Sequence, residues 1–101
     1  MTTNVLYMDL TYSITDIASQ ISQCTSCELH KTRTLTVPGH GDPKSKIMII
    51  GEAPGRNEDQ IGMPFIGKAG DILDILLESI DLDRTKIFIT NMVKCLSLIH
   101  I

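Results

Sequence analysis

The sequence predicts an α/β fold in which parallel strands lie beneath helices. The apolar run at residues 47–50 has no polar alternation, a pattern typical of a strand that is buried on both faces. A second run of β-branched and aromatic residues lies at 86–90, and an amphipathic helix is expected between the two runs. Strand, helix and strand in this order predict a right-handed βαβ unit with parallel strands.

A short helix is predicted at residues 15–23, before the first strand. Ser13 and Asp16 have the Ser-x-x-acid spacing of a helix start. The apolar residues of this segment recur as on one buried face: Ile14, Ile17, Ala18 and Ile21. The segment 28–45 is rich in Thr, Pro and Gly and shows no sustained period. It is predicted to be mostly loop, with a short extended piece at 35–37.

A long glycine-punctuated loop is predicted after the first strand. No helix is expected in this loop until it has passed Gly62, Gly67 and Gly70. A helix of about three turns then follows, with Asp71 at its positive N-terminal end. Its apolar face is expected to contain Ile72, Leu73, Leu76, Leu77 and Ile80. Residues 81–85 form the return turn to the second strand.

Two polar residues directly follow the predicted strands, Glu52 after the first and Asn91 after the second. In open α/β sheets the ligand-binding crevice lies outside the carboxyl ends of the strands. Neighbouring strands lie about 4.8 Å apart, so the two side chains can line one pocket if their strands are neighbours. Pro54 and Phe65, in the loop after the first strand, are expected at the same end of the sheet.

The length and charge of the chain limit what it can be. With 101 residues it forms at most one small domain, and a domain of this size buries only about 60 to 65% of its unfolded surface. The net charge of −3 argues against a general nucleic-acid binder, because non-specific DNA affinity comes mainly from Lys and Arg side chains on phosphates. Residues 1–10 lack a cationic start and carry Asp9 within an apolar stretch, which fits neither a signal peptide nor a membrane span. We therefore expect a cytoplasmic protein.

The three cysteines stand in a pattern typical of a metal site, Cys24-x-x-Cys27 with a distant Cys95. In a reducing cytoplasm they are ligands or spare thiols more often than disulfides. Taken by themselves, they favour zinc first. A thioredoxin-like redox pair is a weaker alternative, because this Cys-x-x-Cys follows a helix instead of opening one.

The last residues of the chain, 96–101, continue none of these patterns. They match one reading frame of a transposon end that is used to prepare sequencing libraries. We therefore expect residues 1–95 to be the N-terminal part of one domain, and residues 96–101, with His100, to be a non-native tail made of translated adapter. Codons that do not spell the transposon end would contradict this hypothesis.

Several motifs occur in collinear order between residues 21 and 95. They are Cys24-x-x-Cys27, GEAPG at 51–55, Glu58-Asp59, Gly62-x-Pro64-Phe65-x-Gly67-x-Ala69-Gly70 and Ile89-Thr90-Asn91-x-Val93-Lys94-Cys95. Together they resemble the N-terminal half of a family 4 uracil-DNA glycosylase, one of the iron-sulfur enzymes of bacteria and archaea. GEAPG is neither a P-loop nor a GxGxxG fingerprint, so nucleotide hydrolysis and hydride transfer fit poorly.

The resemblance implies a three-layer α/β/α sandwich with a central parallel sheet, truncated here after its second strand. It also implies a base-excision repair enzyme that hydrolyses the N-glycosidic bond of deoxyuridine in uracil-containing DNA. Such an enzyme is expected to be a monomer that does not bind a membrane. The target base must leave the stack, because its reacting carbon is unreachable inside a duplex. A related domain is fused to some phage DNA polymerases, so the alternative is a non-catalytic iron-sulfur DNA-binding accessory domain of the same superfamily.

The resemblance assigns roles to residues around the central loop. Glu52 matches the acidic residue of the family's first motif, so it is the candidate for positioning water or stabilising the cationic sugar. Ala53 stands where other glycosylase families carry a water-activating Asp, and backbone amides from Gly51 onward can bond the leaving uracil. Phe65 supplies a ring on which uracil can stack, with a core phenylalanine as the alternative. Asn91 matches the residue that reads the N3–H and O4 edge of uracil, with a capping role after the strand as the alternative.

In this family the three cysteines, Cys24, Cys27 and Cys95, match ligands of a 4Fe-4S cluster. Such a cluster takes four thiolates, and the family's fourth cysteine lies beyond Cys95. The family's catalytic histidine belongs to a second motif that this chain lacks, while His30 and His40 are expected to be solvated. We therefore expect the 101-residue chain to be inactive by itself.

Overall fold

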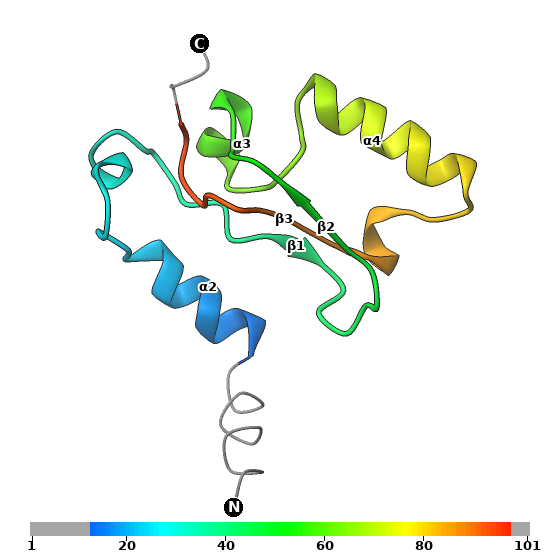
Figure 1. Ribbon diagram of the computed structural model, residues 1–101, viewed down its shortest axis with the longest axis horizontal. Coiled ribbons are helices and arrows are strands. Elements are labelled where there is room, and N and C mark those ends of the chain that lie inside the picture. Colours follow the sequence, from blue (N-terminus) through cyan, green and yellow to red (C-terminus); the bar gives the residue numbers. More distant parts are fainter. Residues whose placement is uncertain (1–12, 98–101) are drawn as a thin grey trace, which may run out of the picture.

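Three strands form one sheet at the centre of the computed structural model, which describes residues 13–97 (Figure 1). The strands β1 (His40–Gly41), β2 (Met48–Gly51) and β3 (Phe88–Asn91) lie in the order β1-β3-β2. Strand β2 runs parallel to β3, which confirms the predicted pairing, and β1 pairs antiparallel with β3. The sheet is therefore mixed and not purely parallel, because β1 forms within the segment 28–45 that the sequence predicts to be mostly loop.

Helices lie on both faces of this sheet, as a three-layer α/β/α arrangement requires. Successive side chains of a strand point to opposite faces. On one face, Leu77 of α4 (Lys68–Ser79) packs with Ile89 in the buried core. On the other face, α2 (Ile14–Ser22) borders an apolar groove of about 200 Å³ whose lining includes Phe88. The α/β class is confirmed, and Figure 1 shows α2 and α4 on opposite sides of the sheet.

The capping box predicted at the start of the first helix is present. The N–H of Asp16 donates to Oγ of Ser13 over 3.1 Å, and the N–H of Ser13 donates to Oδ2 of Asp16 over 3.3 Å. Two donors that would lack partners at the helix start are thus satisfied. The helix occupies residues 14–22, close to the predicted 15–23, and Cys24 follows its end.

The loop after β2 contains a helix that the sequence analysis does not predict, α3 (Arg56–Ile61). The carboxylate of Glu58 reaches back to the N–H of Gly55 over 2.9 Å and so caps the start of this helix. Gly62, with a φ of +85°, ends it. Gly67 is likewise the N-cap of α4. The prediction of an uninterrupted loop is wrong because these glycines begin and end helices.

The two predicted strands differ in burial. All the residues of β3 are buried. Strand β2 is not buried on both faces, because the side chains of Met48 and Ile50 are 55% and 54% exposed while Ile49 packs against the core. Within the described residues β2 is an edge strand, and no residue of α2 is buried against its Met48 face. The prediction of a doubly covered first strand is therefore wrong here.

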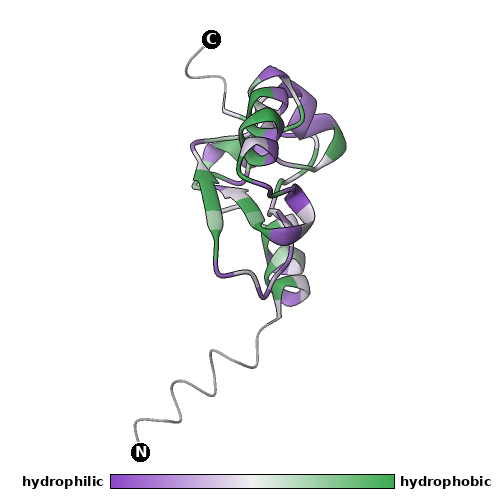
Figure 2. Cartoon of the chain, turned by 90° about the vertical axis from the view of Figure 1, so that its right-hand side faces the viewer, coloured by the Kyte–Doolittle hydropathy of each residue, from purple (hydrophilic) through white to green (hydrophobic). Residues whose placement is uncertain are grey.

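The apolar face of α4 is wider than the surface that it buries. Leu73 and Leu77 pack toward the core, whereas Ile72, Leu76 and Ile80 are exposed. The prediction that all five residues share one buried face is therefore right only in part. Figure 2 shows apolar (green) and polar (purple) bands on the helices.

Two 3₁₀ turns lie in the connections, η1 (Glu28–Lys31) and η2 (Arg84–Lys86). His30, in η1, is half-buried and its Nδ1 lies 2.6 Å from the carbonyl oxygen of Cys27, so it is only partly solvated. His40 is exposed, as predicted. No helix within residues 13–97 combines the length and the apolar character that crossing a membrane requires. The expectations about residues 1–10 and about His100 fall outside the described residues.

Candidate functional site

A cavity of about 380 Å³ opens at the carboxyl ends of β2 and β3. Its volume is near the lower end of the range of about 300 to 1,000 Å³ that is typical of small-molecule sites. Its lining includes every residue that the sequence analysis proposes for catalysis or substrate binding: Gly51, Glu52, Ala53, Phe65 and Asn91. The other lining residues are Gly55, Glu58, Gly67, Lys68 and Ala69. The tertiary structure thus brings the predicted residues together, and their roles stay predictions.

Hydrogen bonds across the strand ends fix the main chain at Glu52. Gly51 and Asn91 are partners in the parallel ladder of β2 and β3. Beyond them, the N–H of Met92 donates to the carbonyl oxygen of Gly51, and the N–H of Val93 donates to that of Glu52, both over 2.9 Å. Asn91 is buried and Glu52 is exposed. The first predicted motif is therefore tied to the segment that follows the second strand.

Gly51 is the point at which the aromatic and amide side chains of the cavity meet. A Cβ atom at this position would overlap both Oδ1 of Asn91 and Cζ of Phe65. The ring and the carboxamide therefore converge on the Cα of Gly51 from two different segments of the chain. Glycine is needed here for the space that it leaves, since any side chain would displace both groups.

Phe65 has a left-handed backbone conformation, with a φ of +53°. Residues with side chains adopt this conformation rarely, and it persists only where surrounding contacts hold it. Phe65 packs against the core cluster that contains Leu77 and Ile89, and it also lines the cavity. Phe65 is thus both a core residue and a cavity residue, so the two readings of it do not exclude each other.

Glu58 organises the main chain around the cavity, a role that the sequence analysis did not predict. Its carboxylate accepts hydrogen bonds from the N–H groups of Gly55 (2.9 Å), Ile66 (2.9 Å) and Gly67 (3.0 Å). Partial burial by itself would raise the pKa of Glu58, but these hydrogen bonds outweigh it and hold the pKa below its ordinary value. The available signal was a Glu three residues after a glycine, which is the spacing of a helix cap.

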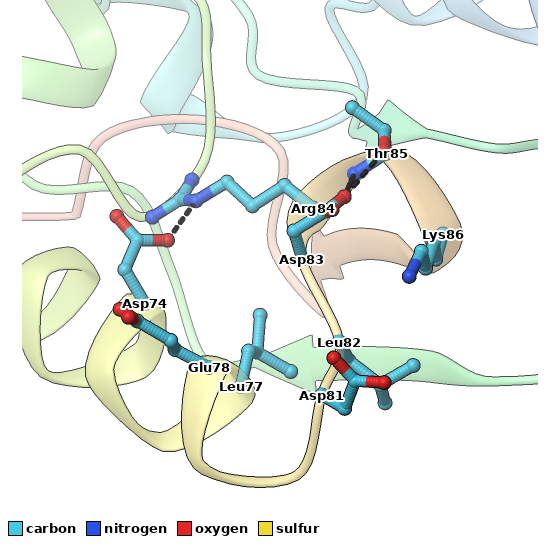
Figure 3. A pocket seen from close by; sticks show the side chains of 9 residues that line it. All are labelled: Asp74, Leu77, Glu78, Asp81, Leu82, Asp83, Arg84, Thr85 and Lys86. Carbon is cyan, nitrogen blue, oxygen red and sulfur yellow. Dashed lines mark hydrogen bonds and ion pairs between the residues drawn. The ribbon is translucent and has the colours of Figure 1, made fainter.

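Arg84 is a second residue that the sequence analysis missed. It lies in η2 and borders a separate cavity of about 530 Å³, whose other charged residues are mostly acidic (Figure 3). Its Nε donates to Oδ1 of Asp74 over 2.6 Å, as Figure 3 shows. Its Nη atoms donate to the carbonyl oxygens of Pro64, Phe65 and Gly70. A single Arg in a return turn carries no sequence pattern that could have revealed these contacts.

Asp59 connects the segment 28–45 to α3. Its buried carboxylate accepts hydrogen bonds from the N–H groups of Thr34 (2.8 Å) and Leu35 (3.4 Å). The piece at 35–37, predicted to be extended, is not part of the sheet, but Val37 is fully buried. Asp59 thus stabilises a segment that has little regular structure of its own.

Lys94 supports the main chain just after Asn91. Its ammonium group donates to Oγ1 of Thr90 over 2.7 Å and to the carbonyl oxygen of Asn91. Oγ1 of Thr90 donates in turn to the carbonyl oxygen of Pro38 over 2.8 Å. Removal from water lowers the pKa of Lys94. The backbone on both sides of the Asn91 side chain is therefore held in place.

The predicted cluster ligands do not form one group in the described chain. Cys27 is exposed, whereas Cys95 is buried and its Sγ accepts a hydrogen bond from Nη1 of Arg33 over 3.3 Å. Hydrogen bonds from the backbone and hydroxyl of Ser26 lower the pKa of the Cys24 thiol. Within residues 13–97, no set of three or more His, Cys, Asp or Glu side chains is arranged to hold a metal ion. The cysteines have the right chemistry for iron and sulfide, but their described arrangement does not fit a cluster.

Known proteins are similar in sequence to most of this chain. The chain is 51% identical over 83 residues to the Type-4 uracil-DNA glycosylase of Archaeoglobus fulgidus, an alignment that covers 82% of this chain and 42% of that protein. It is 48% identical over 84 residues to the Type-4 uracil-DNA glycosylase of Sulfurisphaera tokodaii, covering 82% of this chain and 38% of the relative. With the Thermotoga maritima protein of the same name it shares 40% identity over 79 residues, 78% of this chain and 41% of the relative.

These relatives are longer than the matched region, and the chain spans about two fifths of their length. A family model described as the uracil DNA glycosylase superfamily matches residues 38–97. The matched region contains β1, β2, β3 and all of the cavity lining. Since it covers more than half of the 101 residues, the chain belongs to the uracil DNA glycosylase superfamily, as its motifs predict.

Proposed function

We propose that the complete protein hydrolyses the N-glycosidic bond of deoxyuridine in DNA. The observation that carries this proposal is the convergence of Glu52, Phe65 and Asn91 on one cavity beside Gly51. The names of the relatives support the same activity. Because the reacting carbon is shielded inside a duplex, the uracil nucleotide would be extruded into the cavity before the bond is broken.

In this proposal Phe65 and Asn91 bind the extruded base. The ring of Phe65 offers a face for stacking, and the carboxamide of Asn91 can accept from N3–H of uracil and donate to O4. Their convergence on Gly51 would present the two contacts to the same base, one to its face and one to its edge. A carboxamide whose orientation is fixed would favour uracil over a base whose edge has the opposite donor and acceptor, whereas a freely rotating carboxamide would accept either base.

The proposed role of Glu52 is at the sugar. As the bond between C1′ and N1 breaks, its electron pair leaves with uracil and positive charge develops on the sugar. A carboxylate at Glu52 can stabilise this charge or orient the water that adds to C1′ and loses a proton. Backbone N–H groups of the turn that begins at Gly51 can donate to the departing uracil.

We also propose that Cys24, Cys27 and Cys95 bind three irons of a 4Fe-4S cluster in the complete protein, with one further ligand. The proposal rests on the sequence resemblance and on the preference of such clusters for thiolates. It requires the three thiols to come together as one group, which they do not form within residues 13–97. Iron and sulfide measured in the anaerobically purified protein test it, and a protein that is active without iron would contradict it.

Single-turnover excision of uracil from an oligonucleotide tests the proposed activity. We expect Glu52→Gln and Asn91→Ala each to lower the excision rate by about tenfold or more, the effect of losing one positioned catalytic group. Glu78→Gln is the matched control, because it makes the same change at an exposed position outside this cavity. Excision that neither site variant slows would contradict the site assignment, and DNA binding without excision would favour an accessory domain.

A further inference from the structure

Charged side chains bind both polar groups of the peptide between Phe65 and Ile66. The carbonyl oxygen of Phe65 accepts a hydrogen bond from Nη2 of Arg84. The N–H of Ile66 donates to Oε2 of Glu58 over 2.9 Å. In a trans peptide the N–H and C=O point in opposite directions, so Arg84 and Glu58 approach this peptide from opposite sides.

The guanidinium of Arg84 is itself held in one orientation. Nε donates to Oδ1 of Asp74 over 2.6 Å, Nη1 donates to the carbonyl oxygen of Pro64 over 3.0 Å, and Nη2 also reaches that of Gly70 over 3.2 Å. A guanidinium is planar and presents its donors in a fixed fork, so these contacts set its position and angle together. Lysine, with its single ammonium group, could not reproduce this set.

The carbonyl of Phe65 is enclosed by the first turn of α4. A Cβ atom on Gly70 would overlap this carbonyl and would lie 3.0 Å from Nη2 of Arg84. Pro64 and Gly70, which flank it, are both buried. The hydrogen bond from Arg84 is itself partly buried, and it satisfies a carbonyl that has lost part of its access to water.

These contacts act on a residue whose backbone conformation needs support from its surroundings. Phe65 has the left-handed φ of +53°, and its ring lies against Gly51 beside the Asn91 carboxamide. The Phe65–Ile66 peptide sets ψ of Phe65, so contacts that hold this peptide support the left-handed conformation from which the ring projects. Arg84 does not line that cavity, so any effect that it has on a bound base must pass through the loop.

We infer that Arg84 and Glu58 are positioning residues that clamp the Phe65–Ile66 peptide and thereby hold the Phe65 ring where it stacks on the extruded base. The inference rests on the proposed function, because it concerns the same cavity. Arg84 acts from η2 and Glu58 from α3, one through carbonyl oxygens and the other through N–H groups. The ring is thus held through contacts from two different elements, of which Arg84 lies outside the cavity lining.

A double-mutant cycle in the complete protein tests the inference. Single-turnover excision of uracil from an oligonucleotide is compared for the unchanged protein, Arg84→Gln, Phe65→Ala and the double variant. If Arg84 acts through Phe65, Arg84→Gln lowers the rate about tenfold in the unchanged background, the scale of a misplaced reacting group. It changes the rate little once Phe65 is alanine, because coupled residues are not additive. Equal losses in both backgrounds would overturn the inference.

Two further variants distinguish the effect of losing the Arg84 hydrogen bonds from the effect of losing a positive charge. Lys86→Gln removes an exposed cation from the same η2 turn and should leave the rate unchanged. Arg84→Lys keeps the charge but loses the fork, so it should lose nearly as much activity as Arg84→Gln. Full rescue by lysine would overturn the inference. If Arg84→Gln does not fold, Asp74→Asn, which removes the carboxylate that orients Nε, takes its place in the cycle.

Amide hydrogen exchange in the DNA-free protein gives a readout that does not depend on excision. The N–H groups of Ile66 and Gly67 both donate to Glu58. Arg84→Gln releases the carbonyl side of the same peptide, so these two hydrogen bonds should open more often. Exchange at both amides should therefore become faster by about tenfold or more. Unchanged exchange at these two amides would overturn the clamp, whether or not the protein excises uracil. If Arg84→Gln speeds exchange as expected but the protein without substitutions excises no uracil, the clamp stands and the proposed function is overturned.

Discussion

Gly51 and Asn91 are register partners in the parallel ladder of β2 and β3, and the space above Gly51 is filled by the Asn91 carboxamide. The same space is shared by the ring of Phe65. Backbone pairing therefore fixes the distance between the GEAPG turn and Asn91, while the missing side chain of Gly51 sets how closely ring and amide approach. A change at Gly51 acts on both groups at once.

Gly51→Ala should lower the excision rate of the complete protein by about tenfold or more while changing its stability less. The added methyl group overlaps Oδ1 of Asn91 and Cζ of Phe65, and both belong to side chains that can move aside. Moving them misplaces the two groups proposed to bind the base. Excision rates and thermal unfolding measured together check this, and a normal rate in the alanine variant would show that the convergence at Gly51 has no function.

Phe65→Ala should weaken capture of the extruded base more than it weakens overall binding to DNA. Stacking is worth about 1 to 3 kcal/mol per base and acts only after extrusion, whereas phosphate contacts act before it. The single-turnover rate should fall, while the affinity for an otherwise identical oligonucleotide without uracil should stay nearly constant. Parallel losses in rate and in affinity for the uracil-free DNA would contradict the stacking role.

Glu58 should contribute stability that disappears in acid. Its folded pKa lies below the ordinary value of 4.5, because its hydrogen bonds from backbone N–H groups favour the carboxylate. The contribution is therefore complete above pH 4.5 and is lost as the pH falls below it through the folded pKa. The difference in unfolding free energy between the unchanged protein and Glu58→Gln should shrink over this range.

Glu78→Gln is the control for the acid measurement, because Glu78 is exposed and bonds none of the loop amides. Glu52 and Lys68 line the same cavity as Glu58. Both are present in the unchanged protein, in Glu58→Gln and in Glu78→Gln, so their own contributions to the pH dependence of stability cancel when the three are compared. A stability difference for Glu58→Gln that stays constant from neutral pH to about pH 3, more than one unit below the ordinary pKa of a glutamate, would contradict the assigned role.

The 101-residue chain by itself should neither hold a stable 4Fe-4S cluster nor excise uracil. Three thiolates leave one iron without a protein ligand, and metal-coupled folding weakens as ligands are lost. Within residues 13–97 the edge strands are β1 and β2, because β3 lies between them. The apolar side chains Ile72, Leu76 and Ile80 of α4 are exposed as well.

Anaerobic expression of this chain with iron and sulfide tests that prediction. Visible absorbance reports the cluster, gel filtration reports the oligomeric state, and cleavage of a uracil-containing oligonucleotide reports the activity. We expect a colourless or aggregated product without excision. A brown, monomeric and active product would show that the chemistry resides entirely in these residues.

The sequence by itself determined the residues of the candidate site and the order of the βαβ unit. Apolar runs mark parallel strands, and polar residues directly after them must lie at one edge of the sheet, so the sequence pattern alone places Glu52 and Asn91 together. The capping box of Ser13 and Asp16 was equally predictable, because it depends on residues three apart in the chain.

Only the tertiary structure decided which contacts hold this site. Strand β1 pairs with β3 across a long sequence separation, and Arg84 reaches the carbonyl oxygen of Phe65 from a different turn of the chain. Such contacts leave no local period or spacing in the sequence, because they depend on how elements pack. The exposed side chains of Met48 and Ile50 are a further example. The apolar run in the sequence shows that both faces of this strand could be buried, but only the packing of other elements decides whether they are.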